Sequence, residues 1–198
     1  MANVRRPPAE QNSVQLIGGR WRGRRIRFAD GEGLRPTPAR LRETLFNWLM
    51  HDVRDARVLD LFAGSGALAF EALSRGARQA VLVDNSPAVC SRLTRELATL
   101  GGADAQVIRS DALAFLARPA RPGDAPFDLV FLDPPYHRHL LAPAMRALEN
   151  SGLLAPRAMI YAEAETAPGH DAVPAGWRLH RQQDAGQVCA SLFRRETP

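Results

Sequence analysis

"RVLDLFAGSGALAFEALSRG", residues 57–76, contains the features of a strand, a glycine turn and a helix in direct succession. The apolar run at its start predicts a short buried strand, and Ser65 to Arg75 predict a helix that Gly76 ends. Between them, GSGALA (residues 64–69) fits the GxGxxG/A pattern of a dinucleotide-binding turn. A tight strand–helix turn without a ligand is the alternative interpretation.

The segments that follow alternate strand and helix patterns. Strands are expected at residues 80–84 and 105–109 and in the apolar run before Asp133, and helices at 86–100, 112–117 and 139–149. Residues 158–165, 177–183 and 187–195 then predict three more strands, the last two as an antiparallel pair. Such alternation is typical of a mostly parallel sheet with helices on both faces, and an antiparallel pair fits at its edge. We therefore expect an α/β, Rossmann-like fold.

The N-terminal region has patterns of its own. Residues 14–28, VQLIGGRWRGRRIRF, predict two short strands around a glycine turn, and so a hairpin. A helix is expected next, with Thr37 as its N-cap and Pro38 at the first helical position. Its apolar face would consist of Leu41, Leu45, Trp48 and Leu49. Three arginines would lie at the start of this helix or on its polar face: Arg35, Arg40 and Arg42.

Charge is distributed unevenly along the chain. All 26 basic residues are arginine, and residues 1–42 hold ten of them against three acids, a net charge of +7. The remaining residues hold sixteen arginines against eighteen acids, a net charge of −2. A basic arm on a nearly neutral body favours an anionic partner, and nucleic acid is the partner we expect. The arginines expected to contact it are those of the hairpin: Arg20, Arg22, Arg24, Arg25 and Arg27.

Composition argues against several other classes of protein. At 198 residues the chain fits one domain with a small extension. No apolar run approaches a membrane span, and the N-terminus lacks the apolar segment of a secretory signal, so we expect a soluble, cytoplasmic protein. Cys90 and Cys189 form no CxxC pair, and the five histidines show no ligand spacing. We therefore expect no metal site.

Two classes of cofactor fit the glycine turn. A dinucleotide would place its pyrophosphate at the helix N-terminus and its ribose on Asp84, twenty residues after Gly64, which would make the chain a dehydrogenase. However, the carboxylate of Asp60, four residues before Gly64, would repel a diphosphate. S-adenosyl-L-methionine (SAM) has no phosphate and carries an ammonium and a sulfonium, which suit Asp60. We therefore expect SAM as the cofactor and S-adenosyl-L-homocysteine as its product.

The cofactor contacts that we expect follow from this choice. Gly64 and Gly66 would let the backbone approach the ligand closely, and Asp84 would accept hydrogen bonds from both ribose hydroxyls. Asp111 would accept a hydrogen bond from the adenine amino group, and the alternative role for this residue is a helix cap. The complete set of expected cofactor residues is Asp60, Phe62, Ala63, Gly64, Gly66, Asp84 and Asp111.

DPPY, residues 133–136, ends the apolar strand abruptly, because prolines cannot donate to a sheet ladder. Pro134 holds Asp133 in an extended conformation, and its own carbonyl is free of any helix. Two rigid acceptors of this kind suit an exocyclic amine, and they would stabilise the positive charge that develops on its nitrogen during methyl transfer. Tyr136 offers a ring on which a flipped base can stack. The predicted catalytic set is Asp133, Pro134, Pro135 and Tyr136, and the alternative is a strand-ending turn with a core aromatic.

Five motifs together resemble the RsmD family of bacterial methyltransferases. They are LIGGRWRGRRI, LRPTPARLRETLFNWL, DLFAGSGALAFEALSRGA, DPPY and AGQV, and the similarity extends from about Val14 to Arg195. The resemblance implies SAM as methyl donor and the exocyclic N2 amine of a guanine in 16S ribosomal RNA (rRNA) as target. It implies an assembled or assembling small ribosomal subunit as substrate, and it places Asp133 to Tyr136 at the target amine.

Two other functions remain open at this point. A DNA adenine-N6 or cytosine-N4 methyltransferase would share the amine chemistry, but such enzymes usually carry a sizeable base-recognition insert, for which this chain has no room. A non-catalytic RNA-binding module would not need DPPY beside a cofactor turn. We divide the chain into a basic RNA-binding extension, residues 1–50, and a SAM-dependent methyltransferase domain, residues 51–198, and we expect a monomer.

Overall fold

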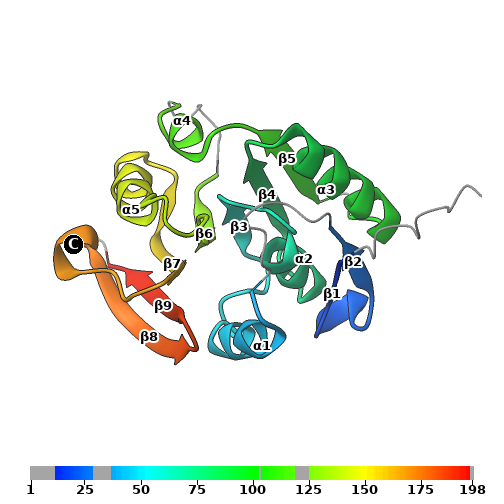
Figure 1. The fold of residues 1–198 in the computed structure, drawn as a ribbon, viewed down its shortest axis with the longest axis horizontal. Helices are drawn as coiled ribbons and strands as arrows, with labels where there is room; N and C mark the ends of the chain where they lie inside the picture. Colours follow the sequence, from blue (N-terminus) through cyan, green and yellow to red (C-terminus); the bar gives the residue numbers. More distant parts are fainter. Residues whose placement is uncertain (1–11, 29–36, 103, 119–124, 197–198) are drawn as a thin grey trace, which may run out of the picture.

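The computed structural model describes residues 12–28, 37–102, 104–118 and 125–196. Its main sheet has seven strands in the order β5-β4-β3-β6-β7-β9-β8 (Figure 1). From β5 to β7 neighbouring strands are parallel, and β9 and β8 continue the sheet in antiparallel pairing. The strands are β3 (Arg57–Asp60), β4 (Gln79–Asp84), β5 (Ala105–Arg109), β6 (Phe127–Leu132), β7 (Leu154–Ala164), β8 (Trp177–Ala185) and β9 (Val188–Arg195). This arrangement confirms the expected Rossmann-like α/β fold with an antiparallel C-terminal pair.

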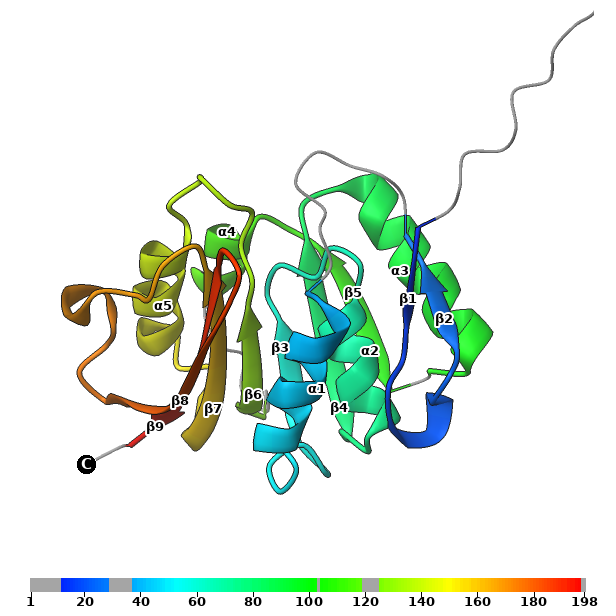
Figure 2. The same ribbon diagram turned by 60° about the horizontal axis from the view of Figure 1, so that its bottom comes forward.

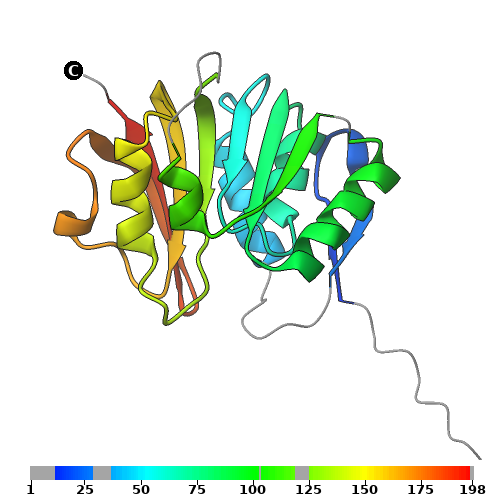
Figure 3. The ribbon, with the colours of Figure 1, turned by 90° about the horizontal axis from the view of Figure 1, so that it is seen from above.

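Helices cover both faces of the sheet. Figure 2 shows the face that carries α1 (Ala39–Trp48), α2 (Ala67–Ser74) and α3 (Pro87–Leu100). Figure 3 shows α4 (Ala112–Leu116) and α5 (Leu141–Asn150) on the opposite face. Successive side chains of a strand point to opposite faces of the sheet and so pack against both helix layers. In β6, Leu129 and Phe131 belong to one hydrophobic cluster, and Val130 and Leu132 belong to the other. Both faces of the sheet are therefore buried, as a parallel sheet requires.

The order of the strands brings the candidate acids together. β3 lies between β4 and β6, at the point where the chain reverses its direction across the sheet. In sheets of this kind, ligands bind outside the carboxyl ends of the strands at such a reversal. Asp60 ends β3, Asp84 ends β4, and Asp133 directly follows β6. Three of the acids singled out in the sequence therefore lie along one edge.

The N-terminal hairpin packs on the body and shares its core. β1 (Ser13–Gln15) and β2 (Arg25–Arg27) pair as predicted, with the short 3-10 helix η1 (Gly19–Trp21) between them. Leu16, Trp21 and Ile26 are buried in the same hydrophobic cluster as α1, α2 and α3. The chain runs so close to α2 that a Cβ on Gly19 would collide with the Ser74 carbonyl, and Gly19 has a φ of +74° that favours glycine. The hairpin is thus anchored on the helix that follows the glycine turn.

The start of α1 differs from the prediction. Thr37 is not the N-cap: Pro38 occupies that position, and the helix begins at Ala39. The Thr37 hydroxyl lies instead 3.5 Å from a carboxylate oxygen of Asp133 and 3.2 Å from one of Glu163. Carboxylates are stronger hydrogen-bond partners than the backbone N–H groups of a helix end. They lie about a hundred residues away in the chain, where a local pattern could not reveal them.

Arg42 lies in the first turn of α1, one of the two expected positions, but its side chain is buried and does not belong to an exposed polar face. Its side chain is 3% exposed; Nε donates to the Thr37 carbonyl at 3.2 Å, and both terminal nitrogens donate to the Gln15 carbonyl at 3.1 Å. The predicted apolar face is confirmed at Leu41, Leu45 and Leu49, whereas Trp48 is only partly buried. Arg40 is exposed as expected, and Arg35 lies outside the described residues.

Other element ends move by a few residues. The helix expected from Ser65 begins at Ala67, the one expected from His139 begins at Leu141, and β7 begins at Leu154 instead of residue 158. Residues 119–124, part of an expected loop, lie outside the described residues. None of the helices in the described part of the chain combines the length and hydropathy that a membrane span requires.

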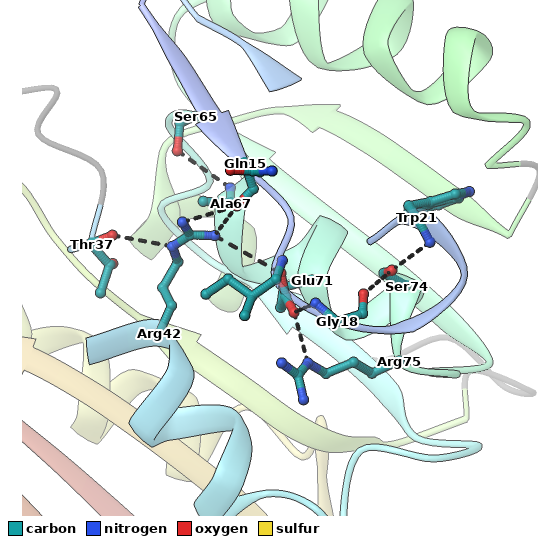
Figure 4. Close-up of polar contacts among 11 residues, drawn as sticks. Gln15, Gly18, Trp21, Thr37, Arg42, Ser65, Ala67, Glu71, Ser74 and Arg75 are labelled. Atoms are coloured by element: carbon teal, nitrogen blue, oxygen red, sulfur yellow. Dashed lines mark hydrogen bonds and ion pairs between the residues drawn. The ribbon is translucent and has the colours of Figure 1, made fainter. Parts of the chain in front are cut away.

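One buried carboxylate joins the hairpin, α1 and α2 (Figure 4). Glu71, on α2, is fully buried and accepts the backbone N–H groups of Ile17 and Gly18, each at 2.8 Å. Arg75 donates to it at 2.7 Å, and Arg42 approaches within 3.9 Å. Burial lowers the pKa of Arg42, and the charge of Glu71 opposes that shift. The carboxylate therefore satisfies two backbone donors and balances buried positive charge at once.

We predict that Glu71→Gln destabilises the protein strongly. The variant loses the negative charge opposite Arg42 and turns an amide N–H toward backbone donors. Breaking a buried ion pair by removing one partner costs about 3–5 kcal/mol. Urea denaturation followed by circular dichroism gives the unfolding free energy. Glu43→Gln, at an exposed position of α1, is the control and should change it by no more than about 0.5 kcal/mol. Equal stability of the two variants would contradict the role given to Glu71.

Candidate active site

A cavity of about 340 Å³ opens at the carboxyl ends of β3, β4, β5 and β6. Its volume lies within the range of small-molecule sites. Most of the predicted site residues line it: Asp60, Phe62, Ala63, Gly64, Asp84, Asp111, Asp133, Pro134, Pro135 and Tyr136. Six further residues line it that the sequence analysis did not predict as part of the site: Thr37, Ser65, Asn85, Ser86, Ser110 and Leu140. The fold therefore gathers both halves of the predicted site, the glycine turn and DPPY, around one space.

Gly66 is the one predicted cofactor residue that does not line this cavity. It occupies the N-cap of α2 with a φ of +76°. A Cβ at this position would collide with the ring of Phe70 and a methyl group of Leu93. Glycine at position 66 therefore serves the turn and its packing against α3.

Asp84 ties the glycine turn to the end of β4. Its Oδ2 accepts the Gly64 N–H at 3.0 Å, and its Oδ1 accepts the Ser86 N–H at 2.8 Å. An ionised carboxylate has about four acceptor positions, so both oxygens can also receive ligand hydroxyls. Asp84 thus fixes the turn and faces the cavity at the same time.

Asp111 caps α4, as the alternative interpretation anticipated. Its Oδ1 accepts the Ala114 N–H at 2.9 Å. The residue also lines the cavity, so capping and a ligand contact are compatible.

Asp60 is buried at the end of β3, with 2% exposure. Burial raises its pKa to about 7; the backbone N–H groups of Ala69 and Phe62 oppose this shift, and the charge of Asp84 adds to it. Ala69 lies in the first turn of α2, so Asp60 occupies the space at this helix N-terminus where a dinucleotide would put its pyrophosphate. A cationic group placed beside Asp60 would favour its ionised form.

The DPPY segment presents a partly buried acid and a partly buried ring. Asp133 and Tyr136 are partly exposed, Pro134 is buried and Pro135 is exposed. Burial raises the pKa of Asp133, and the charges of Glu163 and Asp60 raise it further. The Tyr136 hydroxyl donates to Glu163 at 3.2 Å, which fixes one edge of the ring. Asp133 therefore stands among negative charges, a setting that suits a positively charged guest.

Glu163 and Tyr161 are functional candidates that the sequence did not reveal. Both lie near the end of β7, they are buried, and Tyr161 donates to Glu163 at 3.0 Å. The signal was an acid in an apolar strand two residues after a tyrosine, which places both side chains on one face. Only the parallel pairing of β7 with β6 shows that this acid lies next to Asp133.

The charge of the cavity is one-sided. Among the described residues that line it, four are aspartates and none is arginine or histidine. Nor do the described residues include a group of His, Cys, Asp and Glu side chains that could hold a metal ion. The cavity thus favours an organic cation over a phosphate group.

The five hairpin arginines expected to contact nucleic acid are exposed. Arg20 makes a 3.9 Å ion pair with Asp104, Arg24 reaches the Thr99 carbonyl at 3.5 Å, and Arg25 reaches Ser13 at 3.3 Å. Contacts of this length on exposed side chains are weak. The arginines are therefore available to an external partner.

The raised pKa of Asp60 predicts how stability depends on pH. The folded state binds the Asp60 proton more tightly than the unfolded state, so this stabilisation is complete below about pH 4 and is lost as pH rises through about 7. A shift from 3.8 to about 7 corresponds to at most about 4 kcal/mol. Asp60→Asn should therefore show a smaller fall in unfolding free energy between pH 5 and 8, as measured by urea denaturation in the ligand-free protein. Asp171→Asn, at an exposed acid, should keep the original pH slope, and the same slope in Asp60→Asn would contradict the assignment.

The chain is similar to known proteins over almost its whole length. The family described as "Conserved hypothetical protein 95" matches residues 14–194. Ribosomal RNA small subunit methyltransferase D of Escherichia coli (strain K12) is 49% identical over 183 residues, which cover 92% of this chain and 90% of that protein. The protein of the same name from Haemophilus influenzae is 40% identical, with 94% and 96% coverage.

A solved structure, described as the putative methyltransferase yhhF from Escherichia coli, superimposes with a TM-score of 0.84 at 48% identity. It covers 93% of this chain and 99% of its own. The similarity therefore includes the hairpin, the glycine turn, DPPY and the C-terminal strands. The chain belongs to the family described as "Conserved hypothetical protein 95", which is the RsmD family that its motifs resemble.

Proposed function

We propose that the protein transfers a methyl group from SAM to the exocyclic N2 amine of one guanine in 16S rRNA of the small ribosomal subunit. The observation that carries this proposal is the cavity lined by four aspartates and no basic side chain among the described residues, with DPPY on its wall. In this proposal the protein acts as a monomer in the cytoplasm, and its substrate is an assembled or assembling small subunit. Membership of the RsmD family supports this choice over a DNA methyltransferase.

The residues of the cavity fit SAM better than a dinucleotide. A pyrophosphate would meet Asp60 at the start of α2, and no described basic side chain lines the cavity to offset that repulsion. The ammonium of SAM is attracted to the same carboxylate. When bound, SAM supplies an activated methyl on a sulfonium. Asp84 then accepts the two ribose hydroxyls, and Asp111 accepts from the adenine amino group.

DPPY orients the target amine. The Asp133 carboxylate and the Pro134 carbonyl accept the two amine hydrogens and favour a pyramidal nitrogen with a free lone pair. Both acceptors stabilise the positive charge that develops on this nitrogen. Tyr136 stacks on the flipped base, and Pro135 keeps the segment rigid. Positioning by these rigid groups supplies much of the rate.

The hairpin supplies most of the RNA affinity. Arg20, Arg22, Arg24, Arg25 and Arg27 contact rRNA phosphates, which position the substrate without reading its sequence. Arg25 and Arg27 flank the buried Ile26 and so share the exposed face of β2. They can reach one RNA backbone together.

We predict that Asp84→Ala weakens the binding of SAM and of S-adenosyl-L-homocysteine alike, because both carry the same ribose. Hydrogen bonds to a charged group contribute about 1.5–3 kcal/mol, so we expect about a tenfold or larger loss of affinity by calorimetry. Asp171→Ala, at an exposed acid far along the chain, is the control. An unchanged dissociation constant in Asp84→Ala would place the ribose elsewhere.

Asp133→Ala should abolish most methyl transfer and leave SAM affinity nearly intact, because the carboxylate acts on the amine in the transition state. The loss of one positioned acceptor costs about a hundredfold or more in rate. Transfer of tritiated methyl groups to small subunits measures turnover, and calorimetry measures SAM binding. Asp128→Ala, an exposed acid at the other end of β6, should retain turnover. Near-normal turnover in Asp133→Ala would refute the assignment.

The hairpin arginines should govern the salt dependence of RNA binding. Replacing all five with Gln removes phosphate contacts, and each contact accounts for a slope of about −0.7 to −0.9 in a plot of log K against log salt. About half of these side chains face any one strand of RNA, so the slope should flatten by about two. Measurement of small-subunit binding across a salt series tests this. The control is the joint replacement by Gln of three exposed arginines outside the hairpin: Arg95, Arg157 and Arg181. Parallel lines of equal affinity, with both proteins folded, would refute the role.

A further inference from the structure

A second buried acid lies beside the catalytic one. β6 and β7 are parallel, and Leu132 lies opposite Ala162. The next residue on each chain segment is an acid, so Asp133 and Glu163 lie side by side. Glu163 is 2% exposed, and it is not among the residues that line the cavity. The proposed function assigns it no role. A buried carboxylate is costly unless other groups satisfy it, so its partners indicate what it does.

Three hydroxyl groups converge on the Glu163 carboxylate. Tyr136 donates to Oε1 at 3.2 Å, while Tyr161 and Thr37 donate to Oε2 at 3.0 and 3.2 Å. An ionised carboxylate can accept all three hydrogen bonds. This set of donors therefore stabilises the charged form of Glu163 and, in return, fixes the Tyr136 ring.

Thr37 also connects Glu163 to Asp133. Its Oγ1 lies 3.5 Å from Asp133 Oδ2 and 3.2 Å from Glu163 Oε2. A hydroxyl has one hydrogen, so Thr37 can donate to only one of these acids and can accept from the other. Because Tyr136 and Tyr161 also donate to Glu163, the consistent arrangement is a protonated Asp133 that donates to Thr37, which donates to an ionised Glu163.

The backbone of Thr37 is held from the other side. The Thr37 carbonyl accepts Nε of Arg42 at 3.2 Å, and Arg42 in turn lies 3.9 Å from Glu71 (Figure 4). Thr37 is 4% exposed. Its hydroxyl is therefore presented to the two acids by a rigid support.

We propose that Glu163 is a positioning residue of the methyl-transfer site, which holds the Tyr136 ring and, through Thr37, controls the proton on Asp133. This inference rests on the proposed function. Methylation makes the nitrogen–carbon bond as the carbon–sulfur bond breaks with its electron pair going to sulfur. The nitrogen must then release one proton. An ionised Asp133 can accept it, so the pH at which Asp133 ionises should limit the rate on the acid side.

The groups around Asp133 set that pH. Burial and the charges of Glu163 and Asp60 raise the pKa of Asp133. Burial also raises the pKa of Glu163, but Tyr161, Thr37 and Tyr136 oppose that shift. The pair therefore keeps its shared proton mainly on Asp133. Removing the charge of Glu163 should lower the pKa of Asp133.

Glu163→Gln tests the inference in kinetics. We expect the acid limb of kcat/KM against pH to move to lower pH, because Asp133 then ionises more easily. A displaced Tyr136 ring should lower kcat about 10- to 100-fold at the optimum. SAM affinity by calorimetry should change less than twofold. Glu163→Asp keeps the negative charge, but its shorter side chain moves the carboxylate away from the three hydroxyl donors. This variant should therefore have a lower kcat and an unchanged acid limb.

Glu149→Gln is the matched control. Glu149 is a partly buried acid that pairs with Arg195 at 2.8 Å, away from the cavity lining. This variant should leave the pH limb unchanged, so a general loss of stability can be told apart from a local effect. If Glu163→Gln does not fold, Thr37→Val is the alternative variant, because it removes the hydroxyl between the two acids and keeps the shape of the side chain. A Thr37→Val variant with the kcat and the acid limb of the wild type would overturn the inference.

The tyrosines give a readout that does not depend on turnover. The chain has two tyrosines, Tyr136 and Tyr161, and both donate to Glu163. Protein labelled with 13C at the tyrosine ζ carbon should therefore show two signals, both of which move in Glu163→Gln and neither in Glu149→Gln. Unmoved signals would overturn the inference. If the wild-type protein is inactive, the proposed function is refuted, and the tyrosine signals still test this inference. If the wild type is active and Glu163→Gln has the same kcat and the same acid limb, this inference alone is refuted.

Discussion

The buried Glu71 carboxylate is the constraint on which the relation between the N-terminal extension and the catalytic body depends. It binds the backbone at Ile17 and Gly18, and it balances the buried guanidinium of Arg42. Arg42 in turn donates hydrogen bonds to the backbone carbonyls of Gln15 and Thr37. Because Glu71 lies on α2, directly after the glycine turn, the hairpin, α1 and the cofactor turn form one packed unit. An RNA bound by the hairpin, as we propose, would thereby be placed at a fixed distance from DPPY.

The second constraint is the accumulation of acids at the carboxyl ends of the strands. Asp60, Asp84, Asp111 and Asp133 line one cavity, and Glu163 lies next to it. Burial and mutual repulsion raise the pKa of Asp60 and of Asp133, so the ligand-free site loses stability as pH rises. In the proposed function, a cationic cofactor and an amine that gains positive charge in the transition state would relieve this repulsion. The arrangement that destabilises the empty site would then favour binding and catalysis.

The sequence predicted what depends on local patterns. Apolar runs and glycine stops predicted every strand of the main sheet, its mostly parallel character and the antiparallel pair at the C-terminus. DPPY and the glycine turn were recognised because their chemistry lies within a few consecutive residues. Thr37, Arg42 and Glu163 were misplaced or missed because their partners are distant in sequence. An N-cap pattern cannot show that the carboxylates of Asp133 and Glu163 compete for the Thr37 hydroxyl. Gly66 fits the cofactor pattern, yet its need for glycine comes from Phe70 and Leu93.

Nucleoside analysis tests the central claim most directly. Small subunits purified from a strain that lacks this enzyme are incubated with the protein and isotopically labelled SAM, and their 16S rRNA is digested to nucleosides and to mapped fragments for mass spectrometry. We expect one labelled nucleoside, N2-methylguanosine, at a single position. Asp133→Ala should give at least about a hundredfold less label under the same conditions, and protein-free rRNA fragments should be poorer substrates than the subunit. Label in an adenosine or a cytidine, in DNA but not in rRNA, or in none of these would contradict the assignment of a guanine amine in the small subunit.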